Sequence, residues 1–293
     1  MRWRKRRISD NIDVRRGRAR LGGGSSVPAV AGGLGLPVLV IVLLVVMLNG
    51  GLGSGTSMGD PLDDLTGTGD SAQTSLDGPQ TNEELVDFLS FVLDDLQTFW
   101  ADSFRESGRE YREAQLILFE GVTNSACGGA SVGVGPHYCP VDENVYLDVD
   151  FFRDLRDRFG APGDFALAYV IAHEIGHHVQ QLMGISSSVN AEQSTNPAEA
   201  NELSIRLELQ ADCLAGVWAF TTYERRLLET GDLEEGLNAA AAVGDDRIQQ
   251  RSTGRIDPES WTHGSSEQRV NWFRTGFEQG DPNACDTFSA PVL

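Results

Sequence analysis

The chain is 293 residues long, enough for one ordinary domain with extensions, and its formal charge is −20 at pH 7. It contains no internal repeat and no nucleic-acid-binding motif, which excludes a repeat architecture and a nucleic-acid partner. The charge is unevenly distributed. Residues 1–20 hold nine of the 23 basic residues and two of the 43 acidic ones, which leaves 14 basic and 41 acidic residues over 21–293. We therefore expect the basic arm and the acidic body to face different surroundings.

An uncharged stretch rich in Leu, Val and Ile follows the basic arm, and its length is sufficient to cross a bilayer core of about 30 Å as a helix. We predict a transmembrane helix over residues 27–49. A cleaved signal peptide is the alternative, but the long basic region and the lack of a small-x-small cleavage site after Leu48 favour an uncleaved anchor. Because positive charge stays in the cytoplasm, residues 1–26 are predicted to be a cytoplasmic arm of a single-pass protein of the cell membrane.

Residues 50–80 are rich in Gly, Ser, Thr and Asp and contain no aromatic residue, so we interpret them as a flexible linker. A globular domain is predicted over residues 81–293. Apolar residues at helical intervals predict an amphipathic helix from Asn82 toward Ser103. Strands are predicted at 114–120 and 144–148.

The segment that follows contains the pattern H-E-x-x-H, formed by His173, Glu174 and His177 after a short predicted helix over 151–159. Residues four apart lie on one face of an α-helix, so both imidazoles can reach one metal ion. Glu174 projects beside them, where a carboxylate can take a proton from an activated water. Two histidines on a helix can also be core or surface groups without a metal, so the interpretation depends on a third ligand.

Catalytic zinc takes three protein ligands. In metzincins the third ligand is a histidine six residues after the second one, but that position is Met183 here, which excludes that branch. A glutamate on a later helix is the other solution, and Glu208 offers it within the largely apolar segment 205–220. Asp212 lies four residues further on the same face. It can accept a hydrogen bond from a metal-binding histidine while Glu208 binds the metal.

The remaining segments alternate between connections and helices. We interpret the polar segment 185–198 as a connection between the two metal-binding helices, of which the second is predicted over 199–224. Another helix is predicted around 233–243, and Trp261 and His263 lead into a final helix that contains Val270, Trp272, Phe273 and Phe277.

All four cysteines follow the predicted span and so lie on the oxidising side of the membrane in this prediction. An even number of cysteines there indicates disulfides. Three pairings are possible for two bonds. The short interval in a Gly-rich region favours Cys127–Cys139, which leaves Cys213–Cys285. Four free buried thiols are the alternative. A cysteine-bound zinc site is disfavoured because no C-x-x-C pair is present.

The chain from about Asn82 to Phe288 resembles the bacterial neutral zinc metallopeptidase family, the YpfJ-like proteins. The resemblance is carried by three stretches: HEIGHHVQ at 173–180, ELQADC at 208–213 and SWTHGSSEQR at 260–269. More distantly, the chain resembles the HtpX and CAAX-prenyl-protease group, which has a later T-H-P…R segment. Here Gly264 replaces that proline, which leaves the role of His263 open between oxyanion donor and structural hydrogen-bonding group. Arg269 is expected to orient nearby groups.

The resemblance implies an α+β fold: a mainly helical, zincin-like metallopeptidase domain with a small β-sheet, here preceded by one transmembrane helix. It implies a peptidase with one catalytic Zn²⁺ and a peptide or protein substrate, and the predicted span makes this peptidase membrane-anchored with its catalytic domain outside the cytoplasm. By analogy with zinc peptidases, we expect one of the two predicted strands, 114–120 or 144–148, to be an edge strand that pairs with the substrate backbone. His173, His177 and Glu208 are the expected ligands, and Glu174 is the expected general base. The alternatives are a non-catalytic envelope binding module whose zinc only holds the fold and an acidic scaffold without metal. A purely structural site has no need of Glu174, which favours the enzyme.

Overall fold

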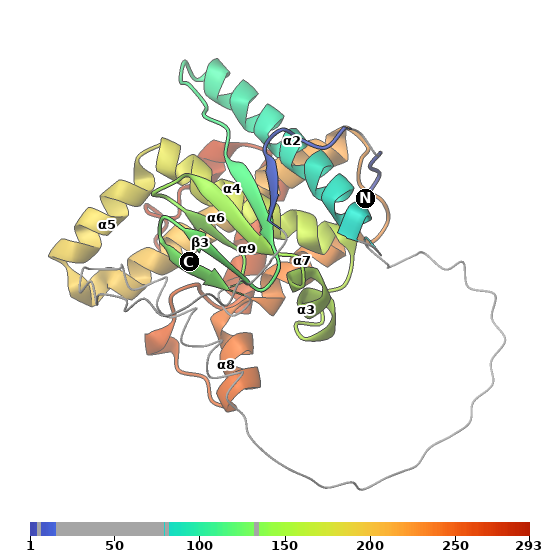
Figure 1. Ribbon diagram of the computed structural model, residues 1–293. Helices are drawn as coiled ribbons and strands as arrows, with labels where there is room; N and C mark the ends of the chain where they lie inside the picture. The colour runs from blue at the N-terminus through green and yellow to red at the C-terminus, as the bar shows by residue number, and fades with distance from the viewer. Residues whose placement is uncertain (5–6, 16–78, 80–81, 132–134) are drawn as a thin grey trace, which may run out of the picture.

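The computed structural model describes residues 1–4, 7–15, 79, 82–131 and 135–293, and the α+β prediction is confirmed. Helices dominate the chain and surround a small sheet (Figure 1). The helices are α2 Asn82–Glu106, α3 Phe151–Asp157, α4 Asp164–Leu182, α5 Ile185–Thr195, α6 Ala200–Glu224, α7 Asp232–Ala242, α8 Asp245–Thr253 and α9 Ser266–Gln279, with 3-10 turns η1 Pro197–Glu199, η2 Pro258–Ser260 and η3 Pro282–Cys285.

In the described part of the chain, six short strands form two sheets, one four-stranded in the order β1-β2-β6-β5 and one two-stranded hairpin. Their bounds are β1 Ile12–Arg15, β2 Gln115–Phe119, β3 Val122–Ser125, β4 Gly128–Ser131, β5 His137–Cys139 and β6 Asn144–Asp148. Both predicted strands are present as β2 and β6, but they pair with each other in parallel and lie inside the sheet. The expectation that one of them is an edge strand is therefore wrong. Among the described strands of this sheet, the edges are β1 and β5.

Residues 1–4 and 7–15, the described part of the predicted arm, pack on the domain. The Trp3 ring packs edge-on against Phe88 of α2, with 5.6 Å between the ring centroids. The Ser9 hydroxyl donates to Asp94. Ile12–Arg15 pairs in parallel with β2, and Figure 1 shows this blue strand beside the green ones. An exposed strand edge is a template for pairing, and the short sequence around Ile12 occupies it.

The predicted localisation in the cell membrane is contradicted. No helix in the described part of the chain has the length and apolar character needed to cross a membrane. Residues 27–49, on which that prediction was placed, lie outside the described residues, as does the predicted linker at 50–80 apart from Pro79.

The segment 185–198 was predicted to be a connection, and most of it is helix α5. No Gly or Pro interrupts it before Pro197. Val189 is buried, and the side chain of Gln193 donates to the Ala200 carbonyl and to Ser204 of α6. One apolar anchor and one amide therefore fix a helix whose composition is otherwise that of a loop.

The core that positions the candidate site lies between α4, α6 and α9. Gly216 of α6 and Gly276 of α9 let these two helices touch backbone to backbone, because a Cβ added to Gly276 would lie 1.9 Å from the Cys213 carbonyl oxygen. A capping box of Ser265 and Gln268 begins α9.

Both predicted disulfide pairings, Cys127–Cys139 and Cys213–Cys285, are confirmed.

Candidate metal centre and active site

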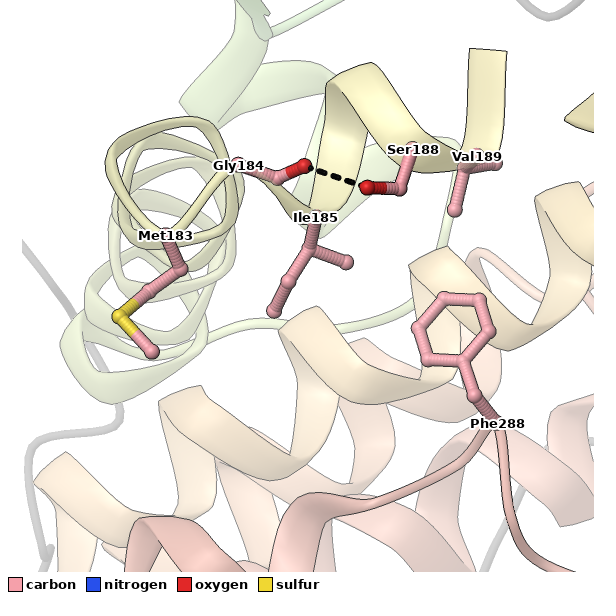
Figure 2. A pocket seen from close by; sticks show the side chains of 6 residues that line it. All are labelled: Met183, Gly184, Ile185, Ser188, Val189 and Phe288. Atoms are coloured by element: carbon pink, nitrogen blue, oxygen red, sulfur yellow. Dashed lines mark hydrogen bonds between the residues drawn. The ribbon is translucent and has the colours of Figure 1, made fainter. Parts of the chain in front are cut away.

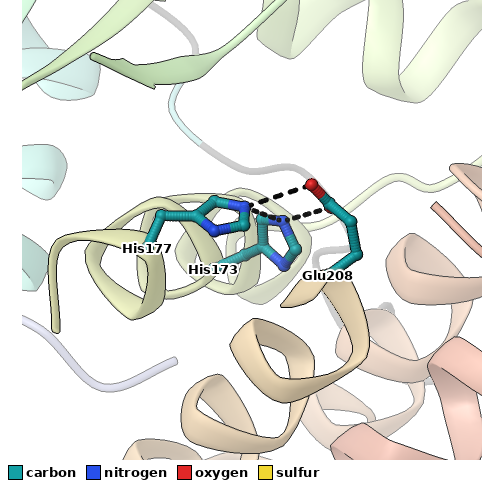
Figure 3. Close-up of side chains that lie close together, drawn as sticks. All are labelled: His173, His177 and Glu208. Atoms are coloured by element: carbon teal, nitrogen blue, oxygen red, sulfur yellow. Dashed lines mark hydrogen bonds and ion pairs between the residues drawn. The ribbon is translucent and has the colours of Figure 1, made fainter. Parts of the chain in front are cut away.

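Helix α4 carries His173, Glu174 and His177 through the centre of the domain. All but a few of its residues are buried, so the helix is fixed on nearly every side. The two imidazoles project from consecutive turns, and their Nε2 atoms lie 3.1 Å apart (Figure 3). The spacing expected from the sequence is therefore present as a pair of nitrogens that converge on one point.

Helix α6 brings Glu208 to the same point. Its carboxylate oxygens lie 3.2 Å from His173 Nε2 and 3.4 Å from His177 Nε2. The approach depends on Gly176, since a Cβ there would lie 3.0 Å from the backbone oxygen of Ala211 in α6. Even an added Cβ would require α6 to shift by a few tenths of an ångström at Ala211, three residues from Glu208.

These three side chains fit a zinc ion in both chemistry and size. Zinc prefers imidazole nitrogen and carboxylate oxygen at about 2.0–2.2 Å in a tetrahedral arrangement, in which neighbouring ligand atoms are roughly 3.3–3.5 Å apart. Here the two Nε2 atoms are 3.1 Å apart, Glu208 Oε2 is 3.2 Å from His173 Nε2, and Glu208 Oε1 is 3.4 Å from His177 Nε2. The three groups are therefore close enough together to bind one ion. The side chains of His173, His177 and Glu208 are between 9% and 16% exposed, which leaves the site buried but reachable.

The other nitrogen of His173 faces a buried carboxylate. His173 Nδ1 lies 2.8 Å from Asp212 Oδ1, which also accepts from the Tyr169 hydroxyl. Arg269 donates to both oxygens of Asp212, from Nε at 2.8 Å and from Nη2 at 2.9 Å. The structure thus brings together Asp212 and Arg269 as the sequence suggested. Tyr169 was missed, although its position four residues before His173 places it on the same helix face.

The other nitrogen of His177 faces an amide that the sequence analysis also missed. His177 Nδ1 lies 2.8 Å from Gln180 Oε1, and Gln180 is fully buried. The signal was the spacing of three residues on one helix. Each imidazole therefore has its own partner on the side away from the metal-binding nitrogen, as metal-binding histidines generally do.

His263 lies at the edge of the site and is held by Asp245. Its Nδ1 is 3.1 Å from Asp245 Oδ1, and the other oxygen accepts from the backbone N–H groups of Thr262, His263 and Gly264. One carboxylate therefore fixes both the ring and the turn that carries it. No sequence signal links Asp245 to His263, because they are 18 residues apart and lie in different elements.

The charges of these groups are coupled. Burial would lower the pKa of His173, but the Asp212 and Glu208 carboxylates outweigh it and raise that pKa to about 10. Burial would raise the pKa of Glu208, but the imidazoles, His177 first, hold it well below its usual value. For His263, burial is opposed by Asp245 and Glu208, which raise its pKa. The site carries ionised carboxylates, which favour a bound cation.

Glu174 is 7% exposed, and among the described residues none forms a hydrogen bond with its carboxylate. It stands next to His173 in the chain with a carboxylate available to a substrate or a water. His178, in contrast, points away from the metal-binding nitrogens: its ring nitrogens contact the Tyr138 hydroxyl and the Arg112 carbonyl. His178 therefore does not belong to the metal-binding group.

A shallow hollow of about 260 Å³ lies where α4 turns into α5 (Figure 2). It begins at Met183, six residues after His177, and Phe288 of the C-terminal tail closes one side. Its lining is mainly apolar and includes none of the metal-binding side chains. It is a separate surface feature, about 9 Å along the helix from His177 at 1.5 Å per residue.

Comparison with known proteins agrees with this geometry. YpfJ of Escherichia coli strain K12 is 45% identical over 298 residues, covering 100% of both chains. Rv2575 of Mycobacterium tuberculosis strain H37Rv is 50% identical over 194 residues, which are 62% of this chain and 65% of that protein. No solved structure matches. None of these matches is to the HtpX and CAAX-prenyl-protease group, so that resemblance stays a prediction. The profile of one family matches residues 1–288, and the chain belongs to that family, described as "Putative neutral zinc metallopeptidase".

Proposed function

We propose that this protein is a zinc-dependent peptidase that hydrolyses peptide bonds in peptide or protein substrates. His173, His177 and Glu208 hold the zinc ion. The observation that carries the proposal is the convergence of three zinc-type ligands: the two Nε2 atoms lie 3.1 Å apart, and Glu208 turns one oxygen to within 3.2 Å of His173 and the other to within 3.4 Å of His177. We take the catalytic domain to span residues 81–293, with β1 added to its sheet.

A bound zinc ion supplies Lewis-acid polarisation of the attacking water and the scissile carbonyl. Glu174 acts as the general base: its carboxylate takes a proton from the water and delivers that proton to the leaving amide nitrogen. The carboxylate suits this role because no described residue competes for it. Asp212 accepts from His173 Nδ1 and so directs Nε2 toward the metal. Arg269 holds Asp212 in turn.

His263 is the candidate donor to the oxyanion. Its Nδ1 is engaged by Asp245, which leaves Nε2 as its free nitrogen. The Asp245 carboxylate favours the imidazolium form, in which Nε2 carries a proton and can donate. A hydrogen-bond donor placed at a developing oxyanion contributes strongly to catalysis of acyl transfer.

The test compares the full chain with its Glu174→Gln variant on a mixed peptide library, with the zinc content of both measured. Glu259→Gln is the matched control, because it removes the charge of an exposed glutamate. We expect one zinc ion in all three proteins and cleavage by the wild type and the control only.

Two other outcomes would contradict the proposal in different ways. Zinc in all three proteins without cleavage by any would favour the non-catalytic binding module with a structural zinc. No zinc in the wild type, after metal reconstitution, would remove the metal site itself.

A further inference from the structure

We propose that two buried amides, Gln180 and Gln210, couple the metal-binding residue His177 to the Cys213–Cys285 disulfide, so that loss of this disulfide weakens zinc binding. The inference rests on the proposed zinc site. In it, the two glutamines are positioning residues, because they act on the metal through His177.

The hydrogen bonds form a continuous chain from the disulfide to the imidazole. Gln210 Nε2 donates to the Cys285 carbonyl at 2.9 Å. Gln180 Nε2 donates to Gln210 Oε1 at 3.1 Å and to the Leu207 carbonyl at 2.7 Å. Gln180 Oε1 lies 2.8 Å from His177 Nδ1. Gln180, Gln210 and Cys285 are between 0% and 8% exposed, so water has little access to the chain.

The direction of this chain is fixed by its carbonyl ends. A carbonyl can only accept, so the NH₂ group of Gln210 must face Cys285 and its oxygen must face Gln180. The NH₂ group of Gln180 must face Leu207, so its oxygen must face His177. His177 Nδ1 must therefore carry the proton, which leaves the Nε2 lone pair for the metal. The C-terminal tail thus selects the tautomer that a ligand needs.

The two imidazoles are held unequally. His173 is oriented by the Asp212 carboxylate, which Arg269 and Tyr169 support. His177 is oriented by a neutral amide, and a hydrogen bond to a neutral acceptor is weaker than one to a charged acceptor. The orientation of His177 therefore depends more strongly on the groups behind its partner.

The disulfide fixes the last of these groups. Cys285 ends the turn η3 in the tail, and its sulfur is bonded to Cys213, the residue directly after Asp212. Without the bond, the carbonyl of Cys285 keeps a hydrogen bond from the Thr287 N–H at 3.0 Å, and Thr287 itself is held by its hydroxyl on the Arg206 carbonyl. These contacts belong to the tail and do not tie Cys285 directly to the residue after Asp212. Movement of that carbonyl leaves the NH₂ group of Gln210 unpaired, and a buried unpaired donor destabilises the arrangement that contains it.

The chain offers a matched control in its second disulfide, Cys127–Cys139, which joins the turn between β3 and β4 to the last residue of β5. The experiment compares full chains that carry Cys213→Ala/Cys285→Ala or Cys127→Ala/Cys139→Ala, and a third that carries Gln210→Met with both disulfides intact. The zinc dissociation constant of each is measured by competition with a chromogenic chelator. No reductant is present, since thiol reductants bind zinc.

We expect zinc affinity to fall about 10- to 100-fold without Cys213–Cys285 and in Gln210→Met, the range seen when partners of metal ligands are removed. The Cys127→Ala/Cys139→Ala variant should stay within about two-fold of the wild type. Circular dichroism of the metal-free proteins checks whether each variant folds. If Cys213→Ala/Cys285→Ala does not fold, Gln210→Met alone provides the test. Affinities within about two-fold of the wild type in folded Gln210→Met or in the Cys213 variant overturn the inference. A wild type that binds no zinc overturns the proposed function instead.

Discussion

The buried pair of Arg269 and Asp212 gives a sharp test of how the site is held together. Arg269 is 3% exposed and Asp212 is fully buried, and two hydrogen bonds of 2.8 and 2.9 Å join them. Arg269→Met fills a similar volume but removes the positive charge. We expect this change to lower the free energy of unfolding of the metal-free protein by about 3–5 kcal/mol, because it removes the guanidinium partner of a buried carboxylate and leaves His173 as its remaining charged partner.

The magnitude follows from what remains around Asp212 after the substitution. Tyr169 and His173 still donate to one of its oxygens, but the other loses its donor. The guanidinium also donates to the Val243 carbonyl at 3.2 Å, so this bond is lost too. If the lost stability comes from the Asp212 carboxylate without its guanidinium partner, neutralising that carboxylate must recover part of the free energy of unfolding. The double variant Arg269→Met/Asp212→Asn should therefore be more stable than Arg269→Met alone.

The assay is urea unfolding at pH 7 of the wild type, the single variant and the double variant, monitored by circular dichroism after zinc removal. The slope of the unfolding free energy against urea must be unchanged for the comparison to report stability. A loss below about 1 kcal/mol for Arg269→Met, or a double variant no more stable than the single one, refutes the reasoning.

Three further predictions follow from other parts of the structure. Gly276→Ala should lower the free energy of unfolding by at least about 3 kcal/mol, since the new Cβ meets the Cys213 carbonyl. The control Gly129→Ala has open space around the new Cβ and should change this free energy little. Equal losses for the two variants in urea unfolding would contradict the prediction. Burial raises the pKa of Glu235 to about 7 from an ordinary value of 4.5; stability from this group is present below pH 4.5 and is lost as the pH rises toward 7. The Tm of Glu235→Gln should therefore fall less than the Tm of the wild type between pH 5 and 8. Parallel curves of Tm against pH for the two proteins would contradict this prediction. His263→Ala should lower kcat about 10²–10³-fold with KM nearly unchanged, and a change in KM alone would argue for a binding role.

Much of the helical framework was predictable because its apolar residues recur at helical spacing. The helices around Leu85, His173, Glu208 and Phe273 appear where the sequence placed them. The disulfide pairings were predictable for a different reason. With four cysteines, a short interval that favours one bond leaves a single partner for the other pair.

What the sequence did not predict depends on contacts between segments that are distant in the chain. The strand at Ile12–Arg15 is four residues long and has no partner until β2 forms about 100 residues later. The helix at Ile185–Thr195 looks like a connection until Val189 finds the core. Local propensity is a weak prior in such segments, and tertiary packing decides their conformation.

The candidate site follows the same division. The three expected zinc ligands were found from the sequence because His173 and His177 share one helix and Glu208 belongs to the ELQADC stretch on a later helix. The groups behind them come from five separate elements. Tyr169 and Gln180 lie on α4, Asp212 and Gln210 on α6, Arg269 on α9, Asp245 on α8 and the Cys285 carbonyl in the tail.

This arrangement has a consequence for how the domain folds and binds metal. Elements that lie after Glu208 in the chain fix the orientation of both imidazoles: α9 through Arg269, and the tail through Cys285. The metal-binding geometry is therefore complete only when the C-terminal third of the chain is packed against α4 and α6. Zinc that binds the finished site stabilises that packing by mass action. Added zinc should then raise the Tm of the wild type and raise it less in Arg269→Met, because in that variant Asp212, which orients His173, loses the Arg269 hydrogen bonds that hold it in place.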